Sequence, residues 1–428
     1  MKELTLKQAA EDCRGTLTPE QAEGMITGVQ IDSRRVKPGD LFVAIKGEKS
    51  DGHDFIGMAA SLGASAALVQ RPVKAAIPTI LVPDTIKAYG DLAAARRERM
   101  GMTVIGITGS VGKTTTKEMT ACMLERTYRT ARTEGNHNNN IGLPLTILRL
   151  DRTVQVCVLE MGMDRPGEID YLADIVRPNV GVITNIGDAH IERLGSRENI
   201  FKAKCELLPH IQKDGLLVLN GDDPMLASLR GHTPVKTVFC GQGEGLDYRA
   251  QTVGGDGESH ILCRLTTPNM DRQVRIPALG EHMIYPALTA SAIGEFFGLT
   301  ADEIQQGLTR FVPTRMRMNI LRRDGQITIL DDTYNANPQS MRAAISVLAD
   351  SHSTWKAAVL GDMLELGPFA PALHTEVGEC LGREKIDCLI AVGEMSAYIA
   401  QGAQDSGVPQ VHHCPDKEAA KTLLEQVI

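Results

Sequence analysis

The segment Ile105–Thr116, IGITGSVGKTTT, constrains the fold of this 428-residue chain more than any other stretch. A β-branched run, TVIGIT at 103–108, comes before the loop, and TTKEMTACMLERTY, which has helical spacing, follows it. A strand, a glycine-rich loop and a helix in that order are typical of a phosphate-binding loop. In such a loop, backbone N–H groups and the positive end of the helix hold an anion. The sequence therefore predicts a parallel sheet with a nucleotide at the end of one strand.

The glycines of this loop do not follow the common spacing G-x-x-x-x-G-K-[ST], because residue 107 is an isoleucine. Gly109 and Gly112 still allow the backbone to curl around an anion. We expect Lys113 to reach the terminal phosphates and the Thr114 hydroxyl to bind Mg²⁺. A glycine-rich turn without a ligand is the alternative, but strand, glycines, Lys-Thr pair and helix together favour a nucleotide, either ATP or GTP.

The chain length and the alternation of strand and helix patterns predict an α/β protein of three domains. We place the domains at residues 1–97, 98–313 and 314–428. Strands are expected at 41–47, 79–83, 103–108, 154–162, 180–187, 215–223, 326–332, 356–362, 387–393 and 409–414. The central block predicts a mostly parallel sheet with helices on both faces, and a small antiparallel appendage near 240–280. The last block predicts a second open α/β domain.

Composition narrows the class of function. The formal net charge is −8, no long basic run occurs, and 4% of residues are aromatic, which argues against nucleic acid as the main partner. Nine scattered cysteines without a C-x-x-C pair favour neither disulfides nor zinc. The N-terminus lacks the apolar core of a signal peptide, and no apolar run approaches the roughly 18 residues of a membrane span. We expect a cytoplasmic protein.

Three positions carry candidate chemistry, each with a plainer alternative. Glu160 ends the predicted strand VQVCVLE and faces the ligand crevice of a parallel sheet, unless it is a surface carboxylate. His190, in TNIGDAHIERLGS, could ligate a metal or orient a phosphate, but a structural role is favoured by the pattern alone. Lys202 and Lys204 in NIFKAKCELL are read, by pattern alone, as solvated helix lysines.

Two polar segments can be interpreted either as ordinary turns or as parts of a binding site. DDTYNANPQSM at 331–341 is rich in turn-forming residues, yet it follows a strand, where an open α/β sheet places its ligand. TEGNHNNNIGLP at 133–144 is either an Asn-rich turn or a hydrogen-bonding surface for a polar substrate.

Taken together, these segments resemble the Mur ligase family, whose signature loop is similar to T-G-[ST]-x-G-K-[ST] and is matched by TGSVGKT at 108–114. The resemblance covers nearly the whole chain in order. It includes DSRRVKPGDLFVAIKGEKSDGHDF at 32–55, GNHNNNIGLPLTIL, LEMGMDRPGEI, TNIGDAHIERLGS and DDTYNANPQSM. The last of these, with VLGDMLELG at 359–367, is most similar to the family member that adds a D-alanyl-D-alanine dipeptide. The D-N-P-[RK] motif of the preceding ligase is absent from the sequence.

This resemblance implies a UDP-binding domain, a central P-loop ATPase domain and a C-terminal Rossmann-like domain. It implies that ATP phosphorylates the C-terminal carboxylate of UDP-N-acetylmuramoyl-tripeptide, and that the amine of D-alanyl-D-alanine attacks the acyl phosphate. Mg²⁺ is the implied cofactor, and a monomer is expected. Another Mur-type amide ligase with a different amine acceptor is the alternative. A folate-type ligase is disfavoured by the segment DSRRVKPGDLF, and a nucleotide-dependent switch is the non-enzyme alternative.

The resemblance also assigns roles to individual positions. Lys113, Glu160, His190 and Lys204 are the implied catalytic residues, with Lys204 carbamylated by CO₂. The same resemblance implies metal binding by Thr114, Glu160, His190 and carbamylated Lys204. Implied ATP contacts are Thr108, Gly109, Ser110, Val111, Gly112, Lys113, Thr114, Thr115, His282, Arg315, Asp331 and Asn335. The implied substrate contacts are Ser33, Arg34, Lys46 and Gly47 for UDP, Asn136 and Asn139 for the muramoyl-peptide, and Tyr334 and Asn337 in the cleft.

Two features depart from the family pattern. The adenine-facing segment, similar to G-x-H-N-x-x-N-A-L in the family, is GEHMIYPAL at 280–288, with Met283 and Pro286 in place of the asparagines. We therefore expect His282 or backbone groups to meet adenine, or nucleotide selectivity to be relaxed. The printed chain also stops at Ile428 inside a predicted helix, where family members continue with a strand and a K-G-S motif, so a shortened C-terminal domain is expected.

Overall fold

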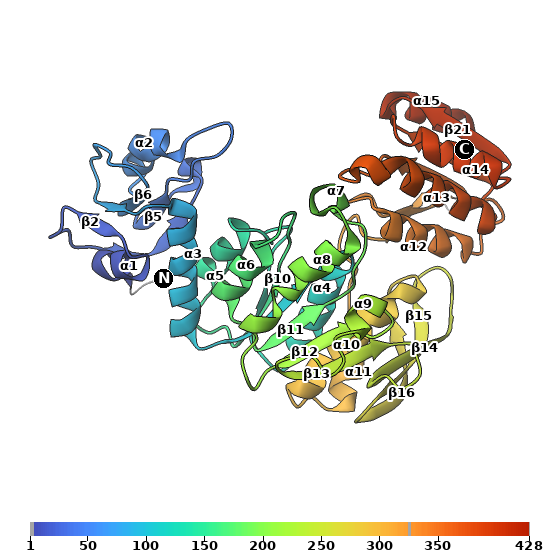
Figure 1. Ribbon diagram of the computed structural model, residues 1–428, viewed down its shortest axis with the longest axis horizontal. Helices are drawn as coiled ribbons and strands as arrows, with labels where there is room; N and C mark the ends of the chain where they lie inside the picture. The colour runs from blue at the N-terminus through green and yellow to red at the C-terminus, as the bar shows by residue number, and fades with distance from the viewer. Residues whose placement is uncertain (1–3, 324–326, 428) are drawn as a thin grey trace.

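The structure is a computed structural model that describes residues 4–323 and 327–427. Three α/β units follow one another along the chain, and Figure 1 shows the N-terminal unit at one end and the C-terminal unit at the other. The mixed α/β class and the three-unit order agree with the sequence prediction. The boundaries after residues 97 and 313 remain our proposal.

The N-terminal unit is built on a five-stranded sheet of order β2-β7-β6-β5-β4, in which β2 is antiparallel to β7 and the other pairs are parallel. Its strands are β1 (Leu4–Thr5), β2 (Thr16–Thr18), β3 (Met25–Ile26), β4 (Gly28–Gln30), β5 (Asp40–Val43), β6 (Ala66–Val69) and β7 (Thr79–Leu81). Its helices are α1 (Leu6–Asp12), η1 (Ser33–Arg35), η2 (Gly52–Phe55), α2 (Ile56–Ser61) and α3 (Thr85–Met100).

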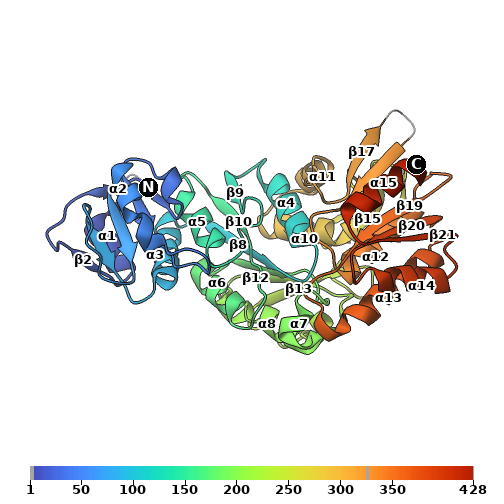
Figure 2. The same ribbon diagram turned by 90° about the horizontal axis from the view of Figure 1, so that it is seen from above.

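Helix α3 joins this unit to the central one. Arg96 Nε donates to the carbonyl of Ile147 over 3.3 Å, and Arg97 Nε donates to the carbonyl of Ile175 over 3.0 Å. Both carbonyls lie in the last turns of central helices, where backbone acceptors have no partner within the helix. The two arginines therefore anchor α3 on the central unit, and Figure 2 shows the helix between the two units.

The central unit holds a nine-stranded sheet of order β16-β15-β14-β13-β12-β11-β8-β10-β9. Its strands are β8 (Thr103–Thr108), β9 (Thr130–Arg132), β10 (Val156–Glu160), β11 (Val180–Ile183), β12 (Leu216–Asn220), β13 (Lys236–Gly241), β14 (Tyr248–Gly255), β15 (Ile261–Thr267) and β16 (Met270–Ile276). Its helices are α4 (Lys113–Leu124), α5 (Gly142–Arg149), α6 (Glu168–Val176), α7 (Ile191–Leu194), α8 (Arg197–Cys205), η3 (Leu208–His210), α9 (Pro224–Ala227), η4 (Glu281–Met283), α10 (Ile284–Phe296) and α11 (Ala301–Thr309).

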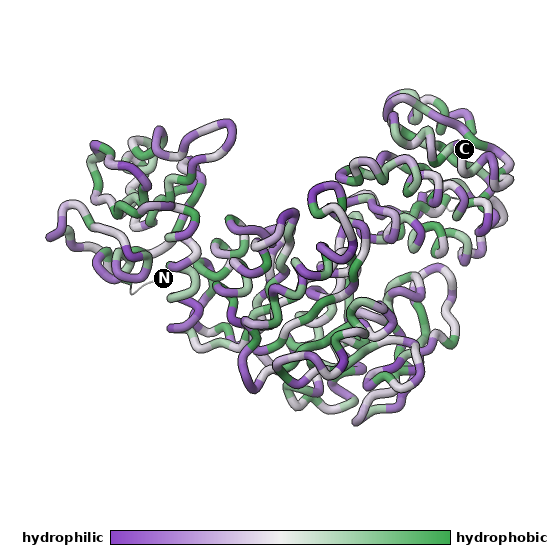
Figure 3. Tube along the Cα trace, in the orientation of Figure 1, coloured by the Kyte–Doolittle hydropathy of each residue, from purple (hydrophilic) through white to green (hydrophobic). Residues whose placement is uncertain are grey.

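The central sheet is buried on both faces, as the near-continuous apolar strands predict. Val156 and Val158 of β10 join the apolar cluster under α4 and α10, whereas Cys157 and Leu159 join the cluster under α5 and α6. Figure 3 shows hydrophobic residues following the strands of this sheet. The predicted antiparallel appendage is β14 to β16, and it continues the same sheet beyond β13.

The C-terminal unit contains a parallel sheet of order β19-β20-β21. Its elements are β17 (Asn319–Arg323), β18 (Ile327–Asp331), α12 (Pro338–Ala349), β19 (Ala357–Gly361), η5 (Gly367–Phe369), α13 (Ala370–Arg383), β20 (Cys388–Val392), α14 (Ala397–Asp405), β21 (Gln410–Cys414) and α15 (Lys417–Val427). The strand predicted at 326–332 is β18, which pairs with β17 in a separate hairpin. Gln326 and Ile428, at the ends of two predicted elements, lie outside the described residues.

All nine cysteines lie among the described residues and are free in the structure. Of the described helices, none is long and apolar enough to cross a membrane.

Candidate active site

A cavity of about 1370 Å³ lies at the carboxyl ends of the central parallel strands, where the central and C-terminal units face each other, and Asp84, Ile86 and Lys87 of the N-terminal unit also line it. Ligands of open α/β sheets bind at this edge. Of the residues predicted for ATP, metal or substrate, the following line the cavity: Gly109, Ser110, Val111, Gly112, Lys113, Thr114, Thr115, Asn136, Asn139, Glu160, His190, Lys204, His282, Tyr334, Asn335 and Asn337. The sheet and loop therefore bring together most of the predicted site.

The glycine spacing of the loop has a steric cause. Gly109 has φ +147°, and a Cβ added there would lie 1.8 Å from Thr184 Oγ1, so a side chain at this position is excluded. Asn185 Oδ1 accepts a hydrogen bond from the backbone N–H of Val111 at 2.9 Å, and Thr184 Oγ1 donates to the Val111 carbonyl at 2.6 Å. The segment that follows β11 therefore holds the phosphate loop in place by hydrogen bonds. Gly109 lies at the point where this segment packs against the loop.

Lys113 begins α4 at the floor of the cavity. Its Nζ donates to the loop carbonyls of Gly109 at 2.7 Å and Ser110 at 3.2 Å. Burial lowers the pKa of Lys113, the charge of Glu160 opposes that change, and Arg317 adds to it. A phosphate anion is a stronger partner for this ammonium than two neutral carbonyls are. The position of Lys113 thus suits an anionic ligand of the loop.

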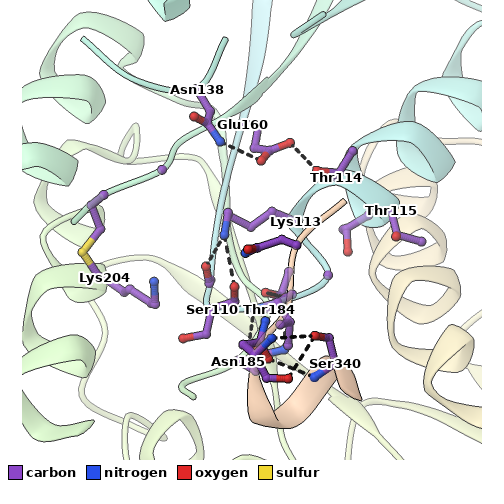
Figure 4. A pocket seen from close by; sticks show the side chains of 18 of the residues that line it. Ser110, Lys113, Thr114, Thr115, Asn138, Glu160, Thr184, Asn185, Lys204 and Ser340 are labelled. Carbon is purple, nitrogen blue, oxygen red and sulfur yellow. Dashed lines mark hydrogen bonds between the residues drawn. The ribbon is translucent and has the colours of Figure 1, made fainter. Parts of the chain in front are cut away.

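Glu160 is the buried carboxylate of the site, with 3% of its surface exposed. Thr114 Oγ1 donates to Glu160 Oε2, and Asn138 Nδ2 donates to Glu160 Oε1, both at 2.9 Å (Figure 4). The surface alternative for Glu160 is wrong. Asn138, which sequence reasoning passed over in favour of Asn136 and Asn139, is the member of the Asn-rich segment that touches this carboxylate.

A second residue that sequence reasoning missed is Lys117, one helical turn after Lys113. It is fully buried, and its Nζ lies 2.7 Å from the Thr133 carbonyl, 3.1 Å from Glu118 Oε1 and 3.8 Å from Glu160 Oε2. Its positive charge compensates two carboxylates in a low-dielectric setting. The signal in the sequence was the spacing of four residues from Lys113, which puts both lysines on one helix face.

Lys204 is buried on α8, with 2% of its surface exposed, so the interpretation as a solvated lysine is wrong; Lys202 is exposed as that interpretation requires. Among the described residues, the Lys204 Nζ has no hydrogen-bond or ion-pair partner. Burial lowers its pKa well below the ordinary 10.5, and the charge of Lys113 lowers the pKa further. Figure 4 shows Lys204 across the cavity from Lys113. Burial and the charge of Lys113 therefore both disfavour the charged ammonium form of this amine.

His190 lies at the start of α7 with φ +64°, and its Nδ1 contacts Glu365 of the C-terminal unit. Burial lowers the pKa of His190, while the charge of Glu365 opposes that change. Within residues 4–323 and 327–427, no group of three or more His, Cys, Asp or Glu side chains is arranged to hold a metal. A metal here would thus depend on hydroxyl, phosphate or water oxygens as well as on Glu160.

Arg315 and Asp331 do not line the cavity, whereas their neighbours Arg317 and Asp332 do. The Arg317 guanidinium lies 4.2 Å from the ring centre of Tyr334, which is cation–π distance. Burial raises the pKa of Asp332 to about 6. Arg315 and Arg317 are two residues apart, and Asp331 and Asp332 are adjacent, so spacing along the sequence alone does not decide which of these side chains faces the cavity.

Several other predicted contacts lie apart from this cavity. Thr108, at the end of β8, is buried beneath the loop, and its Oγ1 has no hydrogen-bond partner in the described chain. The predicted UDP contacts Ser33, Arg34, Lys46 and Gly47 belong to the N-terminal unit and do not line it. Arg34 pairs there with Asp32 at 2.8 Å. These four residues would serve a separate part of an extended substrate.

The predicted adenine segment does reach the cavity. His282, Met283 and Pro286 all line it, together with Tyr285, whose hydroxyl donates to Asp222 Oδ2 at 3.1 Å. Burial lowers the pKa of His282. Met283 and Pro286 offer apolar surface at this end, so a base would be held there by packing more than by side-chain amides.

Fold and site together define a P-loop nucleotide-binding α/β protein of the three-domain ligase architecture. Sequence patterns described as the Mur ligase family catalytic domain, the Mur ligase middle domain and the Mur ligase glutamate ligase domain match residues 25–97, 107–294 and 316–427. The chain belongs to the Mur ligase family.

Individual relatives match the full length. The chain is 40% identical to UDP-N-acetylmuramoyl-tripeptide–D-alanyl-D-alanine ligase of Bacillus subtilis, over 100% of this chain and 93% of the relative. A crystal structure of MurF from Acinetobacter baumannii superposes with a TM-score of 0.92 at 35% identity, covering 100% of this chain and 93% of the other. The ADP complex of MurF ligase from Thermotoga maritima gives a TM-score of 0.81 at 30% identity, covering 93% and 96%.

Proposed function

We propose that this protein is an ATP-dependent ligase that joins D-alanyl-D-alanine to the C-terminal carboxylate of UDP-N-acetylmuramoyl-tripeptide in peptidoglycan precursor synthesis. The observation that carries the proposal is the similarity to ligases of that name over all three units of the chain. The P-loop cavity, which residues of all three units line, supports the proposal because a nucleotide and a second substrate could meet in it.

The reaction requires the carboxylate to be activated, because a carboxylate and an amine do not condense in water. The carboxylate oxygen attacks the γ-phosphorus of ATP, ADP leaves, and the acyl phosphate accepts the dipeptide amine. The resulting tetrahedral species expels phosphate and forms the amide. Two anions meet in the first step, so charge neutralisation and positioning dominate catalysis. Lys113 and the N-terminus of α4 supply that neutralisation at the phosphates.

The oxygen ligands for Mg²⁺ fit the chemistry of the site. Thr114 and Glu160 place a hydroxyl and a carboxylate oxygen 2.9 Å apart at the end of the loop, and Mg²⁺ prefers such hard ligands together with phosphate and water. When bound, the ion would neutralise charge on the phosphates. Asn138 and Lys117 hold Glu160 in place for this role.

We further propose that Lys204 is carbamylated and then serves near His190 at the acyl end of the site. The unpartnered, buried amine with its lowered pKa supports this, since CO₂ reacts with a neutral amine and releases a proton. Mass spectrometry of Lys204-containing peptides under CO₂-preserving conditions tests the proposal. The mass of one added CO₂ is expected, and an unmodified peptide from protein under turnover would contradict it.

The substrate contacts remain proposals of the same kind. Ser33, Arg34, Lys46 and Gly47 would hold UDP, Asn136 and Asn139 would face the muramoyl-peptide, and Tyr334, Asn335 and Asn337 would line the cleft. We also propose that the protein acts as a monomer. The soluble nucleotide substrates support a cytoplasmic location.

An isotope experiment tests the proposed chemistry. Tripeptide substrate labelled with ¹⁸O in its C-terminal carboxylate is incubated with ATP and D-alanyl-D-alanine, and the released phosphate is analysed by mass spectrometry. One ¹⁸O atom per phosphate is expected, because the acyl phosphate retains the carboxylate oxygen. Phosphate without label alongside amide product would contradict the proposed activation. A ligase with another amine acceptor is the second candidate, and it predicts the same label transfer with a different amine.

A further inference from the structure

His190 and Glu365 meet across the central and C-terminal units. Glu365 belongs to the segment VLGDMLELG at 359–367. Its Oε2 contacts His190 Nδ1, and the two side chains are about one third exposed. Both residues have left-handed backbone, with φ +64° for His190 and φ +60° for Glu365. Such geometry is uncommon outside glycine and occurs where surrounding structure holds it.

The backbone around the pair is held as well. The N–H of Glu192 donates to the carbonyl of Glu365 at 3.1 Å. Gly367 has φ +51°, and a Cβ there would lie 2.9 Å from Glu192 Cγ, so the two loops approach closely. Figures 1 and 2 both show α7 beside the beginning of the C-terminal helical layer. The contact is therefore a docking of two loops, of which the side-chain pair is one part.

We propose that Glu365 is a positioning residue: it fixes the imidazole of His190 with Nδ1–H toward the carboxylate and leaves the Nε2 lone pair for the cavity. His190 lines the cavity, whereas Glu365 does not. A histidine that binds a metal or a phosphoryl group commonly donates its other ring N–H to a carboxylate, which sets the tautomer and the ring orientation. A neutral imidazole has one N–H donor and one lone-pair acceptor, so a Nδ1–H held by Glu365 leaves Nε2 as the acceptor.

If the proposal holds, the orientation of His190 in the site depends on the position of the C-terminal unit. The carboxylate that orients His190 comes from the C-terminal unit, so His190 is held only while the η5 loop is docked against α7. This consequence rests on the proposed function for its metal-dependent part. The orientation of the ring itself does not depend on which reaction the protein catalyses.

The test compares Glu365→Ala and Glu365→Gln with the wild type by ¹⁵N NMR of histidine-labelled full-length protein at one fixed pH, without substrates. Wild type is expected to show His190 as the Nδ1–H tautomer. Glu365→Ala should lose that state, and Glu365→Gln, whose amide oxygen still accepts a hydrogen bond, should largely keep it. The matched control is Glu376→Ala, which removes an exposed ion pair with Arg342 in the same unit.

A second readout connects the tautomer to the site. Binding of Mn²⁺ in the presence of ADP is measured by electron paramagnetic resonance, and Glu365→Ala should weaken the affinity about 10- to 100-fold. Glu376→Ala should bind as the wild type does. An unchanged His190 tautomer or an unchanged Mn²⁺ affinity in Glu365→Ala overturns the proposal. If wild type made no amide product while the tautomer still depended on Glu365, the ligase function would fail and the positioning role would stand.

Discussion

The Thr114 hydroxyl donates a hydrogen bond of 2.9 Å to Glu160 Oε2, and this bond ties the phosphate loop to the end of the neighbouring strand. Both groups are buried, and both are oxygen ligands of the kind that Mg²⁺ prefers. The bond therefore fixes, before any ligand binds, the two protein atoms that a magnesium ion at the phosphates would need.

Replacing Thr114 by valine should remove this arrangement at nearly constant side-chain volume. We expect kcat/KM for ATP to fall by about 100-fold or more, since one preorganised polar contact at a charged transition state is commonly worth that much. Steady-state phosphate release at several Mg²⁺ concentrations measures the effect. Thr114→Ser keeps the hydroxyl and should retain most of the activity. Equal activity of the valine and serine variants would show that the hydroxyl has no such role.

Lys117 gives a prediction about stability. Lys117→Met keeps a long side chain but removes the cation paired with the buried Glu160, while Glu118 keeps Arg132 as a partner at 2.8 Å. Breaking a buried charge pair costs about 3–5 kcal/mol. Urea unfolding should show this loss in the free energy of unfolding. Lys202→Met, at an exposed position of α8, is the control and should change it by less than about 0.5 kcal/mol. A similar small change for both variants would mean that Lys117 carries no net stabilisation.

Asp332 gives a prediction about pH. Burial raises its pKa from 3.8 to about 6, so between these values the folded protein binds more protons than the unfolded protein. The contribution of Asp332 to stability is thus complete below pH 3.8 and is lost as the pH rises through about 6. Asp332→Asn, which cannot ionise, should flatten the stability profile in this range.

The measurement for Asp332 is the midpoint of thermal unfolding at a series of pH values from 3.5 to 7.5, chosen to span the two pKa values of about 3.8 and 6. Asp331→Asn removes the neighbouring carboxylate, which accepts from Thr333, and serves as the control for loss of charge; it should keep most of the wild-type slope. A slope in Asp332→Asn as steep as in the wild type would contradict the assignment to Asp332.

The fold could be predicted to a large extent because its signals are local. The β-branched run at 103–108 is β8, and the Lys-Thr helix start is α4, since short apolar runs and glycine turns depend on nearby residues. The hairpin of β17 and β18 was less predictable. The apolar pattern of β18 is the same as that of a strand in the parallel sheet. Only its pairing with β17 in the folded protein shows that it belongs to a separate hairpin.

Site residues that belong to a single motif could be predicted from the sequence. Site residues that come together from distant segments were harder to predict. Lys113 and Thr114 follow from the loop itself. Lys204 resembles a solvated lysine when its helix is considered alone, and only the tertiary packing of α8, which lies beside α6, buries it. Glu365 lies 175 residues from His190 along the chain, so no local spacing could pair them.

The most direct test of the account is the dependence of ligation on the amine acceptor. Purified protein with ATP, Mg²⁺ and UDP-N-acetylmuramoyl-tripeptide is assayed for phosphate release and amide product, with either D-alanyl-D-alanine or free D-alanine added. We predict rapid release matched one-to-one by product with the dipeptide, and neither in comparable amount with the single amino acid or without the tripeptide. Equal turnover with free D-alanine would contradict the account. So would phosphate release at the same rate with and without the tripeptide and the dipeptide.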